Sequence, residues 1–353
     1  MIQSVVRSLL LIALGLIPCV PTFCKDIPEL EKLADGIYAR IVSPDSSSVS
    51  NSGIIILDRC VLLCDTHFTP EGGRSLLDSV RSVTGKPVRY VVNSHAHADH
   101  THGNQIFPEA FIIGSARARS DMVEGDQFAL KRTIGITQNQ LKKLKRELTG
   151  KKAGSEEARQ IGAQIESLDD SLQSMQRLQI VLPDITLDDS LTIRDGKETV
   201  RIFSPGPGHT EGDVLVLLES LKIAFVGDLF FNEAIPNVQD APILQWMKTL
   251  DTLLKLDVEK FVPGHGKVGS KKEVAAFLAY LEELKSLVRP AVDRGEDLEQ
   301  VLEGVQLPAK YSTYLFQNLF PANIQKMYAE LKALQASAAP GGKSKSSKII
   351  NNQ

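Results

Sequence analysis

The stretch V-R-Y-V-V-N-S-H-A-H-A-D-H-T-H-G-N occupies residues 88–104. It opens with an apolar run of β-forming residues, and directly after that run come His95, His97, Asp99 and His100. Neutral imidazoles beside a carboxylate are the donors that a borderline-soft divalent metal such as zinc prefers. Two histidines separated by one residue point to the same side of an extended loop, and the Asp-His pair beyond them reaches a neighbouring point. The spacing therefore predicts two metal positions rather than one.

Three further ligand-type residues follow apolar runs and lie beside glycine. His209 is in S-P-G-P-G-H-T-E-G-D, Asp228 follows L-K-I-A-F-V-G, and His265 is in V-P-G-H-G. In layered α/β folds, the loops that follow the carboxyl ends of strands meet at one edge. Glycine lets the backbone pass close to a metal because it has no Cβ. We therefore expect these three side chains to form a single site with the cluster at 95–100.

These motifs resemble those of the metallo-β-lactamase superfamily: H-x-H-x-D-H at 95–100, G-H-T-x-G at 208–212, G-D at 227–228 and G-H at 264–265. The resemblance covers roughly residues 36–288. It implies an α+β fold, the αββα sandwich, in which helices cover two β-sheets. It also implies seven metal ligands: for the first metal, His95, His97 and His209; for the second, Asp99, His100 and His265; and, bridging the two, Asp228.

The resemblance further implies a hydrolase with two Zn²⁺ ions, with iron or manganese as alternatives. A hydroxide shared by the metals would attack a substrate carbonyl, with Asp99 and Asp228 as the catalytic residues. The commonest zinc β-lactamases carry cysteine where this sequence has Asp228, and a bridging aspartate is more similar to glyoxalase-type thioesterases and lactonases. The expected substrate is therefore a small ester, lactone, thioester or β-lactam amide.

Two other functions stay open at this point. Persulfide dioxygenases are similar at H-x-H-x-D-H and bind one iron, although the complete set of seven ligands argues against a mononuclear site. A non-catalytic metal-binding module, such as a periplasmic one, is the other alternative. Closed structural zinc sites use four ligands that are often cysteine, whereas this set looks open. The net charge of −3 gives no electrostatic argument for nucleic acid as a partner.

The chain begins with one positive charge and an almost wholly apolar run at residues 8–20. This pattern is typical of a signal peptide, which we place at residues 1–24, and it predicts a periplasmic or secreted protein. Leu16-Ile17-Pro18-Cys19 loosely resembles a lipoprotein cleavage box. Any membrane association is expected only through the leader or such a lipid anchor, and an uncleaved anchor is the alternative. The oligomeric state stays open.

The rest of the chain, 25–336, is predicted to form one metallo-β-lactamase-like domain. Within it, residues 115–182 form a helical insertion, with helices at 138–149 and 155–178, because leucines and isoleucines there recur at helical spacing. The insertion is a lid over the site, or else a packed spacer or a dimer contact. Helices are also expected among the C-terminal residues 289–336. Residues 337–353, which include A-A-P-G-G-K-S-K-S-S-K, are expected to be a disordered tail.

Several residues outside the ligand set also receive predictions. Cys60 and Cys64 form no C-x-x-C motif, and a disulfide between them is permitted but not required. Asp65 ends a strand and either orients a ligand histidine or caps a turn. We expect His67 and His102 to lie in solvent or just outside the ligands. Asn104 and Thr210 are expected to donate hydrogen bonds to ligands. The side chains expected to line the pocket are Phe231, Asn232 and Trp246.

Overall fold

A computed structural model of the chain describes residues 29–42 and 48–338. The expected leader lies outside the described residues, as does the expected tail from residue 339 onward. Among the residues that are described, no helix combines the length and the apolar character needed to cross a membrane.

Two β-sheets form the centre of the molecule. The first has seven strands in the order β1-β2-β3-β4-β5-β6-β7, and the second has five in the order β12-β11-β10-β9-β8. The strands of the first sheet are Glu29–Ala34 (β1), Ile37–Ile41 (β2), Ser52–Ile56 (β3), Val61–Cys64 (β4), Val88–Val92 (β5), Phe111–Ser115 (β6) and Ile185–Leu187 (β7). Those of the second are Ser190–Asp195 (β8), Glu198–Phe203 (β9), Leu215–Leu218 (β10), Ile223–Phe231 (β11) and Lys260–His265 (β12).

Three hydrophobic clusters show how the layers stack. In β4, Leu62 faces a cluster that it shares with strands of the second sheet, whereas Leu63 faces a cluster beneath the helix α1. Neighbouring residues face opposite sides because side chains alternate along a strand. The far side of the second sheet packs on a third cluster, which contains Trp246 and Phe277 from helices. The order helix, sheet, sheet, helix is the predicted αββα sandwich, and the fold prediction is confirmed.

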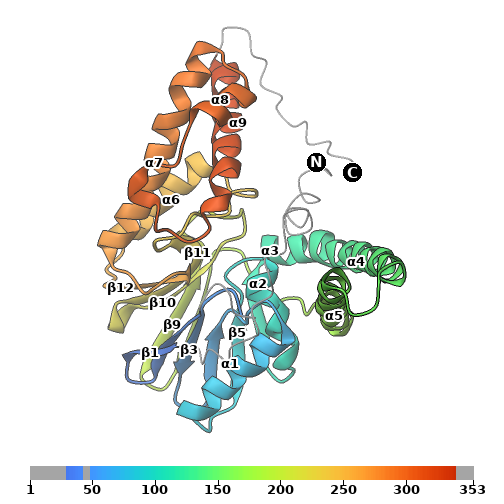
Figure 1. Ribbon diagram of the computed structural model, residues 1–353. Helices are drawn as coiled ribbons and strands as arrows, with labels where there is room; N and C mark the ends of the chain where they lie inside the picture. The colour runs from blue at the N-terminus through green and yellow to red at the C-terminus, as the bar shows by residue number, and fades with distance from the viewer. Residues whose placement is uncertain (1–28, 43–47, 339–353) are drawn as a thin grey trace, which may run out of the picture.

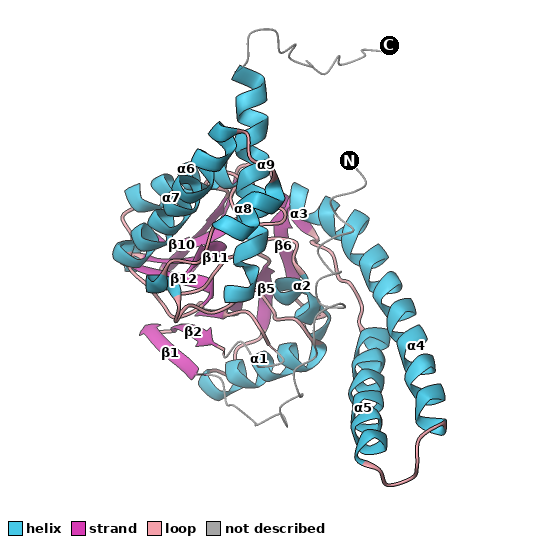
Figure 2. Cartoon of the chain, turned by 45° about the horizontal axis from the view of Figure 1, so that its top comes forward, coloured by secondary structure: helices cyan, strands magenta, loops and turns pink. Residues whose placement is uncertain are grey.

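The helices cover the outer faces of the sheets or extend from them. They are Pro70–Val83 (α1), Ala98–Thr101 (α2), Ala116–Asp121 (α3), Gln127–Thr149 (α4), Glu156–Arg177 (α5), Ile243–Lys255 (α6), Lys271–Arg294 (α7), Leu298–Gly304 (α8) and Phe320–Ala338 (α9). Helix α1 lies on the first sheet, while α6, α7 and α9 gather on the second (Figure 1). Figure 2 shows the pair α4–α5 extending beside the sandwich.

The pair α4–α5 is inserted between the parallel neighbours β6 and β7. Helix α4 begins at Gln127, earlier than the expected residue 138, because α3 continues into it through a π-helical turn at Met122–Asp126. The buried apolar residues of the pair include Leu141 and Ile161, and neither belongs to the three clusters of the sandwich. The two helices therefore bury their apolar faces mainly against each other.

Candidate metal centre

The seven predicted ligands come together at one edge of the sandwich, although they come from both halves of the chain. His95 and His97 follow β5, and Asp99 and His100 lie in the short helix α2. His209 lies between β9 and β10, whereas Asp228 and His265 belong to β11 and β12. Their ligand-type atoms fall into two groups: His95, His97, His209 and Asp228; and Asp99, His100 and His265.

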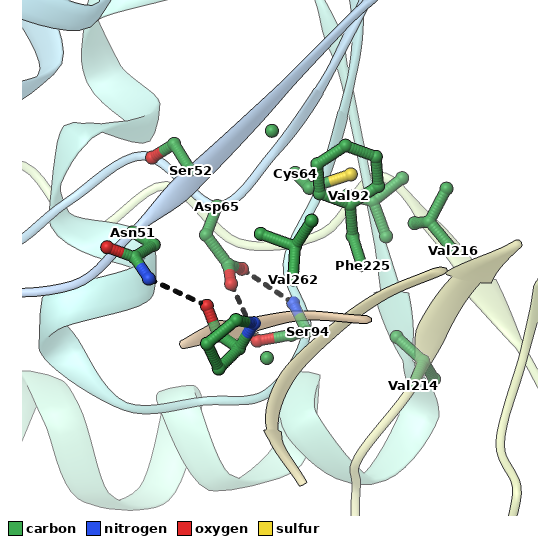
Figure 3. Close-up of a pocket in the computed structure, with 13 residues that line it drawn as sticks. Asn51, Ser52, Cys64, Asp65, Val92, Ser94, Val214, Val216, Phe225 and Val262 are labelled. Carbon is green, nitrogen blue, oxygen red and sulfur yellow. Dashed lines mark hydrogen bonds between the residues drawn. The ribbon is translucent and has the colours of Figure 1, made fainter. Parts of the chain in front are cut away.

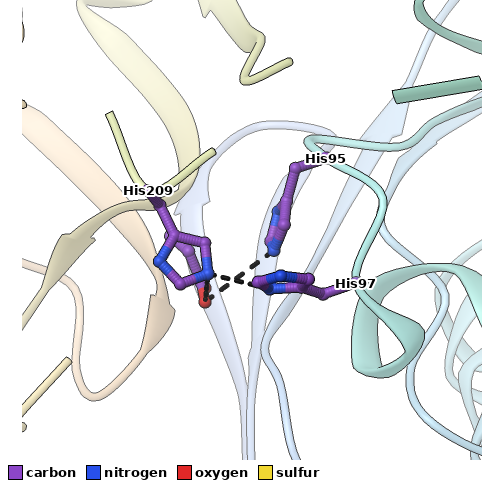
Figure 4. A group of neighbouring side chains, drawn as sticks. His95, His97 and His209 are labelled. Carbon is purple, nitrogen blue, oxygen red and sulfur yellow. Dashed lines mark hydrogen bonds and ion pairs between the residues drawn. The ribbon is translucent and has the colours of Figure 1, made fainter. Parts of the chain in front are cut away.

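In the first ligand group three imidazoles converge (Figure 4). The Nε2 atom of His209 lies 2.9 Å from the Nδ1 atom of His97 and 3.2 Å from the Oδ2 atom of Asp228. The Nε2 atom of His95 lies 3.9 Å from the same oxygen. A shared cation would place these donors at metal–ligand distances instead, since zinc binds histidine nitrogen at about 2.0–2.1 Å.

The second ligand group faces the other oxygen of Asp228. The Oδ1 atom of Asp228 lies 3.3 Å from the Nε2 atom of His100 and 3.5 Å from that of His265. The Oδ2 atom of Asp99 lies 3.2 Å from the Nε2 atom of His265 and 3.4 Å from that of His100. Asp228 thus directs one carboxylate oxygen to each group, which is the arrangement expected of a bridging ligand.

Two glycines make room for Asp228. The strand β11 continues through Gly227 to Phe231, with a register shift at Gly227, where φ is +53°. A Cβ atom at Gly227 would meet the Cβ atom of Ser94 at 2.5 Å, and one at Gly264 would meet the Oδ1 atom of Asp228 at 1.8 Å. The irregularity therefore turns the carboxylate into the site while the strand keeps its pairing.

Asp65 orients ligands of both groups, which decides between the two roles left open for it. Its Oδ2 atom lies 2.8 Å from the Nδ1 atom of His100. The backbone N–H of Ser94 donates to the Oδ1 atom of Asp65, and the Ser94 hydroxyl donates to its Oδ2 atom (Figure 3). The Ser94 hydroxyl in turn lies 3.0 Å from the Nδ1 atom of His95. Such partners fix the orientation of a ligand imidazole and leave its other nitrogen for the metal.

Asp240 plays the corresponding part for His97. Its Oδ2 atom lies 3.0 Å from the Nε2 atom of His97, which leaves the Nδ1 atom directed at His209. Sequence reasoning missed this residue because Q-D-A-P matches no metal motif and lies between β11 and α6. Only the polar character of the loop marks it, and that signal is common in loops.

Electrostatics divide the imidazoles of the site into neutral ones, such as those of His95 and His209, and protonated ones, such as that of His265, which faces an ionised carboxylate. Burial lowers the pKa of His95 well below its ordinary value and lowers that of His209 to about 3. Burial alone would raise the pKa of Asp228, but the facing imidazoles of His265 and His100 hold it well below its ordinary value. For His265, burial lowers the pKa, and the Asp228 carboxylate overcomes this and raises it to about 9. A cation that binds here therefore displaces protons.

The donor chemistry fits divalent metal ions. The Nε2 atoms of His95 and His100 and the Oδ1 atom of Asp228 are buried without a hydrogen-bond partner in the described structure. Buried polar groups in folded proteins are nearly always paired, so these atoms point to a missing partner of positive charge. Nitrogen and oxygen donors of this kind suit zinc, iron or manganese.

The predictions for residues around the ligands have mixed outcomes. The side chain of Asn104 forms hydrogen bonds with those of Asn93 and Thr66, and the hydroxyl of Thr210 donates to Asp213. In the described structure these hydrogen bonds go to residues other than the candidate ligands. The prediction that His67 and His102 lie in solvent is wrong, because these side chains are 0% and 7% exposed. His102 stacks on the ring of Phe68.

The predicted pocket-lining role of the aromatic residues is wrong as well. Phe231 and Trp246 are buried, and their ring centroids both lie 5.6 Å from that of His209. Phe231 also stacks on His265 at 5.3 Å. Both side chains belong to the hydrophobic core, and from there their rings pack against the imidazoles of the candidate ligands. Asn232 points elsewhere and donates to the backbone oxygen of Lys267.

Cys60 and Cys64 are both buried and unpaired, so the permitted disulfide is not formed. Cys60 directs its thiol toward Asp195, and Cys64 lies in the wall of a small cavity between the sheets. Burial raises the pKa of the Cys64 thiol well above its ordinary value, which keeps it protonated and unreactive.

Comparison with known proteins agrees with this geometry. Residues 47–265, more than half of the chain, match the family described as the metallo-β-lactamase superfamily. The chain is 26% identical over 233 residues to a metallo-β-lactamase type 2 of Bacillus sp. (strain 170), covering 64% of this chain and 71% of that protein. It is likewise 26% identical over 227 residues to that of Bacillus cereus, covering 63% and 69%.

Among solved structures, a metallo-β-lactamase from Pontibacter korlensis aligns with a TM-score of 0.53 at 19% identity, covering 72% of this chain and 99% of that one. This likeness shows the fold. The motifs, the two ligand groups and the length of the family match together show that the chain belongs to the metallo-β-lactamase superfamily.

Proposed function

We propose that the chain is a hydrolase that binds two zinc ions and cleaves a carbonyl substrate. Membership of the superfamily and the clustered His and Asp ligands support metal-dependent hydrolysis in general. The observation that carries the two-metal proposal is Asp228, whose two oxygens face separate ligand groups. A single metal would use only one of these groups and leave buried donors of the other unpaired.

When bound, the metals would supply Lewis acidity toward a carbonyl oxygen and lower the pKa of a water toward about 7. The protein holds His95 and His209 neutral, so that they bind a cation without first losing a proton. Asp99 and Asp228 stay ionised. The side chain of Asp99 is 23% exposed, whereas that of Asp228 is 4% exposed, so we assign to Asp99 the orientation of the attacking water.

The substrate class is a small molecule with an ester, lactone, thioester or β-lactam amide bond. The Bacillus relatives are named metallo-β-lactamases, which supports testing β-lactams. Asp228, where the commonest zinc β-lactamases are expected to carry cysteine, supports the lactone and thioester classes instead. The carboxylate of an aspartate is a harder ligand than a thiolate.

The experiment measures metal content per chain together with turnover of a chromogenic β-lactam, an acyl lactone, a thioester and a phosphodiester. We expect close to two zinc ions and turnover of at least one carbonyl substrate. In Asp228→Ala we expect metal content and turnover to fall together, because both groups lose a ligand. Full activity of this variant with both metals retained would refute the bridging role. One iron per chain without hydrolysis would favour the oxidoreductase of the persulfide dioxygenase type.

We also propose that the protein is exported, since residues 8–20 have the composition of a signal-peptide core. The N-terminus of the exported protein, determined by mass spectrometry, is expected after about residue 20–25. A mature chain that retains Met1 would contradict this proposal.

A further inference from the structure

Arg40, in the strand β2, is a buried cation that the proposed chemistry does not use. Its side chain is 0% exposed, and burial lowers its pKa to about 10. Within the described residues its guanidinium donates only to neutral groups: the hydroxyls of Ser48, Ser75 and Ser79, and the imidazole of His67. Burying a charge is costly when none of its described partners carries the opposite charge, so stability alone does not explain this residue.

The contact with Arg40 fixes the protonation of His67. The Nη1 atom of Arg40 is a donor only, so the Nε2 atom of His67 accepts and the Nδ1 atom carries the proton. The Nδ1–H group donates to the backbone oxygen of Ser50 at 2.8 Å. Burial and the charge of Arg40 lower the pKa of His67 well below its ordinary value, in agreement with a neutral ring.

The chain of contacts continues to the second ligand group. The hydroxyl of Ser50 donates to the backbone oxygen of Asp99. The peptides around His67 also contact this segment: the N–H of Thr66 donates to the backbone oxygen of His100 in α2, and the N–H of Gly103, just after α2, donates to that of His67. The backbone of His67 has a φ of +73°, a left-handed conformation that is uncommon for residues other than glycine and that the surrounding structure must hold in place.

The first ligand group is held differently. His95 is oriented by Ser94, and His97 by Asp240. No contact described for Arg40, His67 or Ser50 reaches a side chain of that group. We propose that Arg40 and His67 are positioning residues that, through Ser50, hold Asp99 in place for the second metal ion. This inference rests on the proposed two-metal function and assigns a role to a cluster whose described contacts lead to the second ligand group.

The test is stepwise titration of Zn²⁺ into chelator-treated full-length protein, followed by calorimetry, with Co²⁺ absorption as a second readout of coordination. Ser50→Ala removes the hydroxyl that donates to Asp99. Ser79→Ala is the matched control, because it removes a hydroxyl that contacts the Nε atom of Arg40 and not the Nη1 atom that faces His67. His67→Ala removes the imidazole, and His67→Asn restores an N–H donor near the backbone oxygen of Ser50.

In Ser50→Ala and His67→Ala we expect the affinity for the second ion to fall about 10–100-fold, the usual effect of losing an outer partner of a metal ligand. The affinity for the first ion is expected to stay unchanged, Ser79→Ala to behave like the wild type, and His67→Asn to recover part of the loss. Should His67→Ala fail to fold, the milder Ser50→Ala still decides the matter.

Two results would overturn the inference alone: wild-type binding of two ions with both affinities kept in Ser50→Ala, or an equal loss at both steps that Ser79→Ala reproduces. A wild-type protein that binds fewer than two ions would instead refute the proposed function, and the inference with it. The two failures are therefore distinguished by the wild-type titration.

Discussion

At the scale of single residues, Asp240 offers a direct test of how the first ligand group is held. Its carboxylate accepts from His97, which is itself directed at His209. We expect Asp240→Ala to weaken binding of the first ion about 10–100-fold, because the imidazole loses the partner that fixes its orientation. Zn²⁺ titration of the chelator-treated variant measures this affinity.

The matched control is Asp121→Ala, which removes a nearby carboxylate that pairs with Arg117 instead. If both variants lose affinity equally, the effect comes from net charge near the site and not from the bond to His97.

The raised pKa of Asp213 leads to a prediction of how the free energy of unfolding depends on pH. Its side chain is buried, and burial raises its pKa from 3.8 to about 7, although two hydrogen bonds from Thr210 favour the charged form. As pH rises from about 4 to 7, the unfolded chain releases this proton while the folded chain keeps it. The free energy of unfolding therefore falls over this window, and the full loss is reached above about pH 7.

In Asp213→Asn this contribution is absent, so the free energy of unfolding of the variant, relative to wild type, is expected to increase from about pH 5 to about pH 8. Urea unfolding of chelator-treated protein at the two pH values measures it. The asparagine also loses one acceptor for Thr210 at every pH, and for that reason the change with pH is compared, not the absolute value. Exposed Asp251→Asn is the control and should show no such change.

The clustering of the seven candidate ligands was predictable from sequence, whereas most of the side chains that contact them were not. His95, His97, Asp99 and His100 are crowded into one short segment, and chance rarely places so many ligand-type side chains together directly after a strand. Asp240 and Arg40 are single residues that reach the site only through tertiary packing. Asp65 is an intermediate case. Its position at the end of a strand indicated either a partner of a ligand histidine or a turn cap, and its contact with His100 favours the first.

At the scale of elements, alternation and helical spacing located most strands and helices. The strand β1 was not predicted, because E-L-E-K-L-A has the charges and leucines of a helix, and its pairing with β2 decides its conformation. The helix α7 runs from Lys271 through Pro290 to Arg294, where Gly295 ends it in a left-handed conformation. Pro290 does not end the helix, because the packing of α7 on α9 and α6 outweighs one lost hydrogen bond.

The hairpin α4–α5 predicts a local effect on stability. Leu141 is 4% exposed and lies outside the three clusters of the sandwich. We expect Leu141→Ala to cost about 2–5 kcal/mol, since it leaves a cavity between the helices. Hydrogen exchange of residues 127–177 should accelerate, while the number of bound metal ions should not change.

The control is Ile136→Ala in the same helix, where the side chain is 38% exposed and the loss is expected to be small. Loss of metal in Leu141→Ala would instead show that the hairpin supports the ligand groups, which would favour the role of a lid over that of a packed spacer.

At the scale of the whole molecule, the site joins the two halves of the chain. His95 and His100 follow the first sheet, whereas His209, Asp228 and His265 belong to the half that builds the second. Bound metal ions would therefore link the two sheets, and the unfolded chain does not assemble these ligands. A ligand that binds only the folded state stabilises it by about 2.7 kcal/mol per site at about 100 times its Kd.

We accordingly expect Tm to rise by several degrees as Zn²⁺ is added to chelator-treated protein, and to rise further with each increase in concentration, because the stabilisation grows with the logarithm of free metal. Asp228→Ala should lose most of this rise, since its carboxylate faces both groups. Mg²⁺ is the control, because this hard cation prefers oxygen ligands and should leave Tm almost unchanged. If the wild-type protein has the same Tm with Zn²⁺ as with chelator, these seven side chains do not bind metal tightly, whatever family the chain belongs to.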